Sequence, residues 1–254
     1  MWPRLGRAVP APPDAQAADR TQPPHRRRIM AIIANEHVAL VHGFLANKYM
    51  FGTLARRLRE RGLRPRAWGY WNIACSLLVH ADRFAAELAR LDADPGIDRI
   101  HLIGHSMGCI IGRAALDRYR PAKFGRFVML APPNRGSFVA TAAAGTFGRF
   151  LRPVAELSTA SDSLVNLLPT PQGVDIGVIA ARYDALVTEE STRPDGPHAH
   201  TVLPTWHTGL LYRRETADLA ATFLTTGSFA AASQGDPGSE QDGTTRSTAA
   251  RSHA

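Results

Sequence analysis

Cysteine is scarce in this 254-residue chain, and its two cysteines, Cys75 and Cys109, form no C-x-x-C pair. The sequence therefore offers neither a disulfide framework nor a cysteine-based zinc or redox motif. Apolar runs are also short, and none reaches the roughly 18 residues that a membrane-spanning helix requires. The first residues carry positive charge without the apolar segment of a secretory signal. We therefore expect a cytoplasmic protein with no transmembrane segment.

Lysine is nearly absent, since only Lys48 and Lys123 stand among the 30 basic residues that give a formal net charge of +8. Part of the excess arginine lies in the first 34 residues. A basic tail is able to touch nucleic acid or an anionic membrane surface. However, the sequence lacks interleaved aromatic residues and has no helix-turn-helix or zinc-finger spacing. We expect no nucleic-acid partner, and we leave peripheral lipid contact and the oligomeric state open.

Composition divides the chain into three parts. Residues 1–34 are rich in proline and arginine with few large apolar residues, which predicts a disordered tail. Met30 opens the ordered-looking sequence, so translation starting there is an alternative. Residues 227–254 have the Ser, Gly, Thr and Ala composition of a second disordered tail. One folded domain is expected over 35–226, a length that suits a single α/β unit.

Short apolar runs alternate with amphipathic stretches along this domain. The runs predict strands at His37–His42, Arg66–Tyr70, Arg99–Ile103, Phe127–Ala131, Asp175–Ala181 and His200–Leu203. The amphipathic stretches predict helices at Tyr49–Arg61, Leu77–Leu91, Met107–Tyr119 and Gly209–Leu224. This alternation predicts an α/β fold with a mostly parallel, doubly wound sheet. Residues 137–171 are apolar and irregular, which predicts a small cap inserted between two sheet units.

The strongest motif is Gly104-His105-Ser106-Met107-Gly108, between a predicted strand and a predicted helix. G-x-S-x-G in this context is a nucleophile elbow, a turn so tight that the serine Oγ is exposed. The start of the helix adds a positive field where negative charge develops. We therefore predict Ser106 to be a nucleophile.

A second motif, His42-Gly43-Phe44, follows the first predicted strand. Acyl transfer needs two backbone N–H groups directed at the oxyanion of the tetrahedral intermediate. The motif's position upstream of the elbow predicts one donor at Phe44 and the other at Met107, the residue after the nucleophile.

The base is selected by its order in the chain. Triads of this architecture run serine, acid, histidine, which leaves His198, His200 and His207. His207 stands in a loop between the last strand and the last helix, and we predict it to be the base. His198 and His200 are interpreted as surface histidines, since no nearby Cys, Asp or Glu completes a metal site around them.

The acid is predicted at Asp184, directly after the strand Asp175–Ala181, where a carboxylate is able to orient the imidazole. Glu190 is the reserve candidate.

Together, these motifs resemble those of bacterial lipases and esterases of the α/β-hydrolase superfamily, over about residues 36–224. Ala131–Ser137 (APPNRGS) and His207–Leu210 (HTGL) add to the resemblance. Tyr183–Arg193 is similar to the segment that carries the acid in such proteins, which again implies Asp184. Ala185 and Cys109 stand where those proteins often have glycine. The resemblance implies the α/β-hydrolase fold and a reaction that requires no cofactor and no metal.

These expectations combine into a serine hydrolase that cleaves small carboxylic esters with apolar acyl groups. Phe147 and Phe150 of the insertion are candidates for the substrate pocket, with core packing as the alternative. The same triad also suits an acyltransferase or a thioesterase. A non-catalytic binding protein of the same fold is the other alternative, although it has no need of all three triad residues.

Overall fold

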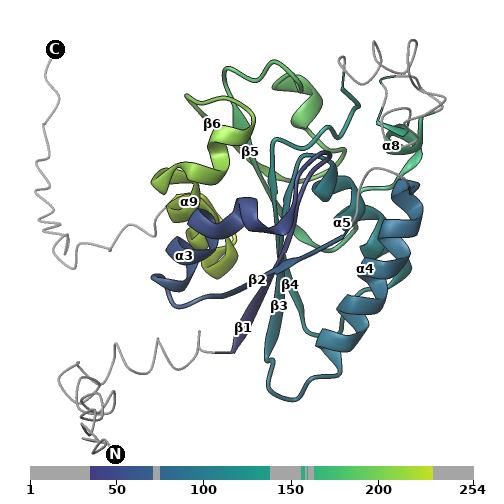
Figure 1. Cartoon of the computed structure of the whole chain (residues 1–254), viewed down its shortest axis with the longest axis vertical. Helices are drawn as coiled ribbons and strands as arrows, with labels where there is room; N and C mark the ends of the chain where they lie inside the picture. Colours follow the sequence, from purple (N-terminus) through teal and green to yellow (C-terminus); the bar gives the residue numbers. More distant parts are fainter. Residues whose placement is uncertain (1–34, 71–74, 138–155, 158, 160–162, 231–254) are drawn as a thin grey trace, which may run out of the picture.

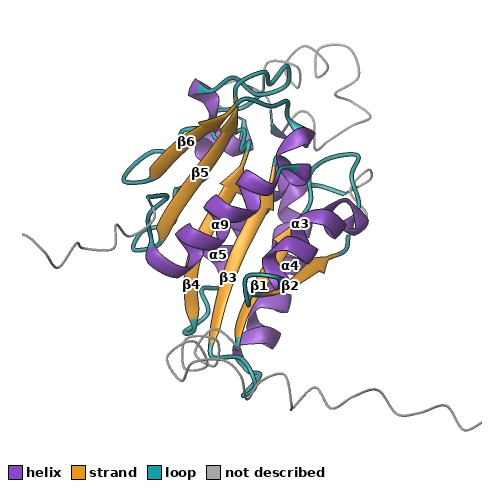
Figure 2. Ribbon diagram, turned by 90° about the vertical axis from the view of Figure 1, so that its left-hand side faces the viewer, coloured by secondary structure: helices purple, strands orange, loops and turns teal. Residues whose placement is uncertain are grey.

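The computed structural model describes residues 35–70, 75–137, 156–157, 159 and 163–230. Six strands form one sheet in the order β2-β1-β3-β4-β5-β6, and every neighbouring pair is parallel. All carboxyl ends therefore lie along one edge, where the arrowheads point upward in Figure 2. The strands are β1 (Glu36–Val41), β2 (Arg64–Trp68), β3 (Arg99–His105), β4 (Phe124–Leu130), β5 (Asp175–Ala181) and β6 (Ala199–Leu203).

Helices cover both faces of the sheet, as a doubly wound fold requires (Figure 1). The helices α3 (Gly52–Arg59) and α9 (Arg214–Thr226) pack on one face, whereas α4 (Leu77–Asp92) and α5 (Met107–Arg118) pack on the other. The predicted α/β fold class is confirmed. Shorter elements are η1 (Lys48–Phe51), α8 (Leu164–Leu167), η2 (Glu190–Thr192) and η3 (Thr208–Tyr212).

Each face of the sheet has its own hydrophobic core. Successive side chains of a strand point to opposite faces, and β1 follows this rule. Val38 and Leu40 pack in the core under α3 and α9, whereas Ala39 and Val41 pack in the core under α4 and α5. The central strands are thus buried on both sides, which explains why they appear in the sequence as continuous apolar runs.

Several element boundaries differ from the predicted ones. The strand β2 spans Arg64–Trp68 and so lies two residues earlier than expected, and β3 runs on to His105, directly before the predicted nucleophile. The predicted single helix at the end of the domain is interrupted by Arg213, whose backbone is extended at φ −80° and ψ 138°. The result is the short helix η3 followed by α9, and the turn leading into η3 carries His207.

Two described residues of the insertion pack in the core. Leu157 and Val165 are buried with residues of α4 and α5. Residues 138–155, with Phe147 and Phe150, lie outside the described residues, as do the tails 1–34 and 231–254.

Packing continues beyond the expected boundary at residue 226. The Phe229 ring lies 5.0 Å from the Phe223 ring and packs against the core under α3 and α9. Of the helices that the structure describes, none combines the length and the apolar character needed to cross a bilayer.

Candidate active site

The candidate site lies where the strand order of the sheet reverses. The chain leaves β1 toward β2 on one side, and β3 then pairs with the other edge of β1. In open parallel sheets, the crevice beyond the carboxyl ends of such strands is the usual ligand site. Here the loop after β1 meets the turn after β3 very closely, because a Cβ atom on Gly43 would lie 2.9 Å from the Ser106 Cβ.

Ser106 has the strained backbone of a nucleophile elbow. Its φ of 53° and ψ of −126° lie in a region that L-residues with a side chain rarely adopt. The two flanking glycines make this turn possible. A Cβ on Gly104 would lie 2.7 Å from the Cys109 backbone, and one on Gly108 would lie 2.1 Å from the Val41 carbonyl oxygen. Ser106 is therefore held at the start of α5, between β3 and the helix.

Asp184 and His207 form a hydrogen-bonded pair at the same edge of the sheet. The Nδ1–H of His207 donates to Asp184 Oδ2 at 2.7 Å, and the two side chains are 10% and 2% exposed. The other carboxylate oxygen of Asp184 accepts from the amides of Leu186 and Val187, at 2.8 and 3.0 Å. Burial alone would raise the pKa of Asp184, but the hydrogen bond from His207 and the two amides outweigh it and lower that pKa. Asp184 is thus an ionised acceptor that fixes the imidazole with Nε2 as the free nitrogen.

The imidazole of His207 lies beside the elbow. His105, which directly precedes Ser106, donates from Nε2 to the His207 carbonyl oxygen at 3.2 Å, and the two rings lie 4.9 Å apart. Burial lowers the pKa of His105 to about 3, so this neighbour is neutral. Within the described chain, no hydrogen bond joins the Ser106 hydroxyl to His207. Such bonds are often long without substrate and shorten when it binds.

The two predicted oxyanion donors belong to the two segments that meet at Ser106, the start of α5 and the loop after β1. Met107 is the first residue of α5, so its amide has no partner within the helix. Phe44 follows Gly43 in the loop after β1, and the next residue, Leu45, has a φ of 52°. Neither amide donates to a backbone carbonyl among the described residues.

Tyr70 anchors the loop that carries Phe44. Its hydroxyl donates to the His42 carbonyl oxygen, and its ring is stacked on the His42 imidazole at 4.1 Å and 9°. The sequence pattern assigned no role to Tyr70, because an aromatic residue at the end of a predicted strand is ordinarily a packing residue.

The remaining sequence candidates lie elsewhere. Glu190 is 84% exposed at the side chain and lies 4.0 Å from Arg135. His198 bonds the Gly196 carbonyl, and His200 contacts the Thr192 hydroxyl. Among the described residues, no cluster of three His, Cys, Asp or Glu side chains is able to hold a metal ion.

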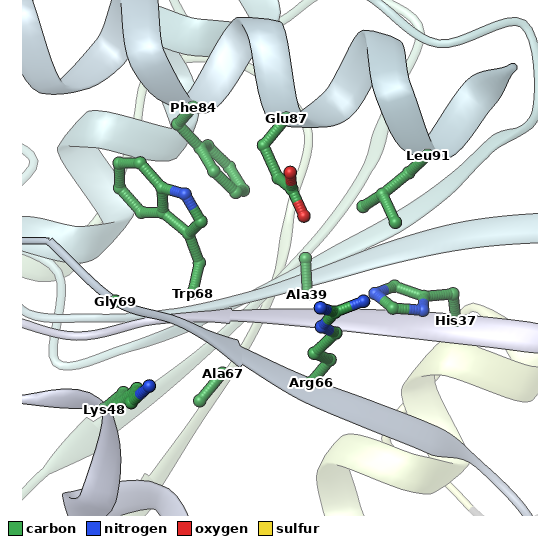
Figure 3. A pocket seen from close by; sticks show the side chains of 10 residues that line it. All are labelled: His37, Ala39, Lys48, Arg66, Ala67, Trp68, Gly69, Phe84, Glu87 and Leu91. Atoms are coloured by element: carbon green, nitrogen blue, oxygen red, sulfur yellow. The ribbon is translucent and has the colours of Figure 1, made fainter. Parts of the chain in front are cut away.

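One well-formed cavity lies away from this site, between α4 and the edge of the sheet (Figure 3). It has a volume of about 310 Å³. In Figure 3 the side chains of Phe84, Glu87 and Leu91 descend from α4 toward Trp68 and Arg66. Neither the predicted triad residues nor the two predicted oxyanion donors line it, so this cavity is not the crevice at Ser106.

A comparison with protein-family models assigns this chain to a family. The sequence model described as the alpha/beta hydrolase family matches residues 38–248. No curated protein sequence matches this chain.

Many solved structures match this chain, and three of them illustrate the kinds of enzyme found. The mature lipase BlEst2 of Bacillus licheniformis has a TM-score of 0.60 at 16% identity, over 76% of this chain and 92% of its own. The phospholipase PlaB of Legionella pneumophila, in complex with thio-NAD, has a TM-score of 0.59 at 19% identity, over 76% of this chain and 59% of its own. A carboxylesterase of Nitrososphaera gargenis has a TM-score of 0.55 at 17% identity, over 76% of this chain and 91% of its own. At such identities the likeness shows a shared fold.

Proposed function

Because this chain belongs to the alpha/beta hydrolase family, we propose that it is a carboxylic ester hydrolase with Ser106 as nucleophile, His207 as base and Asp184 as the orienting acid. The observation that carries this proposal is the strained Ser106 elbow beside the His207–Asp184 pair. A buried, ionised carboxylate that orients an imidazole has a direct use in activating a serine.

The proposed reaction proceeds through an acyl-enzyme. As the Ser106 Oγ attacks the ester carbonyl carbon, His207 Nε2 takes the hydroxyl proton. The amides of Phe44 and Met107 hold the resulting oxyanion. When the tetrahedral intermediate collapses, the alcohol leaves with the proton from His207, and the acyl group stays on Ser106. Water then attacks the acyl-enzyme, with His207 accepting its proton, and releases the carboxylic acid.

The surface around the site favours an amphiphilic ester. Leu45, Tyr183 and Trp206 are 72%, 65% and 65% exposed, and each is adjacent in sequence to a proposed site residue. Tyrosine and tryptophan suit the boundary between water and apolar groups. The names lipase, phospholipase and carboxylesterase among the structural neighbours point to the same class of substrate. We include in the proposal a peripheral contact of Leu45, Tyr183 and Trp206 with lipid.

A substrate panel tests the reaction class. Purified protein should release p-nitrophenol from p-nitrophenyl esters, with far slower turnover of the matching anilides and thioesters. Product analysis by mass spectrometry should find the free acid, even when an alcohol is added as acceptor. Transfer of the acyl group to that alcohol as the main product would instead indicate an acyltransferase.

The acyl preference follows from an apolar pocket wall. We predict that kcat/KM rises from acetate toward butyrate or hexanoate, since each buried methylene contributes about 0.8 kcal/mol. Replacing Phe147 or Phe150 by alanine should flatten this rise if those rings line the pocket. A profile that peaks at acetate and is unchanged in both variants would contradict the assignment of these residues.

A further inference from the structure

A second cavity lies on the α5 side of the molecule, and none of the five proposed site residues lines it. Its volume is about 410 Å³, which falls within the range of small-molecule sites. Side chains from α5, from α8 and from the loops that follow β4 and η2 form its wall. Its charged lining residues are Arg113, Arg135, Arg193 and Asp195.

Arg113 is a buried cation whose hydrogen-bond acceptors are all neutral. Its side chain belongs to α5, and the residue is 3% exposed. One terminal nitrogen donates to the Asn134 side-chain oxygen at 3.0 Å, and the other donates to the Leu168 carbonyl oxygen. Among the described residues, the buried Nε–H has no acceptor. No carboxylate in the described part of the chain lies within 4 Å of this guanidinium.

A buried charge of this kind is costly. Removing an ion from water carries a large free-energy penalty, which a counter-ion ordinarily offsets in part. Burial lowers the pKa of Arg113 to about 10, so the side chain nevertheless stays protonated at neutral pH. The protein therefore holds a positive charge at the cavity wall with no carboxylate within 4 Å among the described residues, and the exposed Asp195 acts on it only from a greater distance.

The rim of the cavity adds two further cations. Arg135 lies 3.6 Å from Asp195, whose side chain is 91% exposed. Arg193 lies 3.8 Å from Glu189. Exposed pairs at such distances are weak, so both guanidinium groups are able to turn toward a ligand. Glu190 also lies 4.0 Å from Arg135, so each rim arginine has an exposed acidic neighbour, and Arg113 is the lining arginine without one within 4 Å among the described residues.

We propose that this cavity binds a phosphorylated small molecule, with its phosphate facing Arg113, Arg135 and Arg193. A phosphate monoester carries a charge of about −1.5 to −2 at pH 7 and three acceptor oxygens. Its three oxygens match the three guanidinium groups of the lining, whereas a carboxylate offers only two oxygens. Arginine suits such a group because its planar fork binds two oxygens at once. Val165 and Leu168 provide apolar wall for the organic part of the ligand.

Calorimetric titration of the full chain at low salt tests this assignment, with phenyl phosphate as the probe and benzoate as the matched carboxylate. Phenyl phosphate should bind saturably, raise the melting temperature and bind more weakly as salt is added. Benzoate should bind at least about tenfold more weakly, as expected for the loss of one charge-assisted contact. Equal affinity for benzoate, or no saturable binding below about 10 mM phenyl phosphate, would overturn the proposal.

Variants locate the binding site. The double substitution Arg135→Gln and Arg193→Gln changes only exposed side chains, and it should weaken phenyl phosphate binding by about 100-fold. Arg56→Gln with Arg83→Gln removes the same charge from exposed positions on α3 and α4 and should leave affinity within about twofold. Arg113→Met should abolish binding; should that variant fail to fold, the rim variant decides alone. An equal loss in both double variants would show non-specific attraction and refute the site.

Discussion

At the level of single residues, the proposed triad requires one carboxylate, Asp184, to orient His207. Asp184→Asn keeps the shape of the side chain but removes the charge that stabilises the imidazolium. We expect it to lower kcat about 10⁴-fold, with a smaller effect on KM, by analogy with the corresponding change in the serine protease triad. The measurement is steady-state turnover of a p-nitrophenyl ester.

Glu190→Gln is the control for this prediction, because Glu190 is exposed and contacts Arg135. It should leave kcat within about twofold, as do most substitutions of exposed side chains. A large loss in Glu190→Gln together with full activity in Asp184→Asn would show that the carboxylate has been wrongly assigned.

The sequence was most informative for these individual residues. The pairing of His207 with Asp184 was predicted because order along the chain and position after a strand restrict the choice to a few residues. Tyr70 and Arg113 were missed for different reasons. Tyr70 acts through a backbone carbonyl, which no side-chain motif encodes. Arg113 had a signal, since Met107–Leu116 is otherwise small or apolar on every side, and a helix of that kind is buried.

At the scale of elements, the packing of β1 against α5 determines where Ser106 lies. Gly108→Ala places a methyl group 2.1 Å from the Val41 carbonyl oxygen, where only a backbone shift relieves the clash. We expect it to lower the free energy of unfolding by about 1–3 kcal/mol, as overpacking does. Because that shift moves the elbow, we also expect a loss of ester turnover. Urea denaturation and turnover of the same preparation measure both effects.

Gly52→Ala is the matched control on α3, where a new methyl group meets nothing within 4 Å. Because alanine favours a helix over glycine, this variant should be neutral or more stable by up to about 1 kcal/mol. If Gly108→Ala were as stable and active as Gly52→Ala, the tight contact between β1 and α5 would not exist in solution.

Element types were predictable because period-2 and helical patterns are strong over the central segments, whereas boundaries depended on tertiary contacts. The last predicted helix continues an unbroken helical pattern across Arg213, yet the chain extends there. At this point the Tyr212 carbonyl oxygen accepts a hydrogen bond from Arg57 of α3 at 2.6 Å, a contact between segments far apart in the sequence. A contact of this kind follows from the fold and is not encoded in local propensity.

At the scale of the whole molecule, buried histidines make the fold sensitive to acid. Burial is the largest cause of a lowered pKa in the buried His37, His42, His80 and His105 and in the half-buried His200. Below pH 6.5 the unfolded chain takes up protons that the folded chain refuses, so stability falls as the pH decreases. From linkage, we expect the free energy of unfolding to drop by at least about 3 kcal/mol between pH 7 and pH 5.

The lowered pKa of Asp184 contributes in a lower window, since its stabilisation is present above about pH 4 and is lost as the pH falls through the folded-state value. Urea titrations across this range give the slope. His105→Gln should reduce the slope between pH 7 and 5, whereas His198→Gln, outside the core, should not. A denaturation midpoint that stays constant from pH 7 to 5 would contradict this account of the core.

The central claim is that Ser106 is the activated nucleophile of this molecule, and covalent labelling tests it most directly. A fluorophosphonate reacts with a serine that a neighbouring base has activated. Intact mass spectrometry followed by peptide mapping should find one label per folded chain, on Ser106, and none on urea-unfolded protein. The Ser106→Ala variant should take up no label and lose ester turnover by about 10⁶-fold. A label on another serine, or a Ser106→Ala variant that still hydrolyses esters at the original rate, would contradict the account.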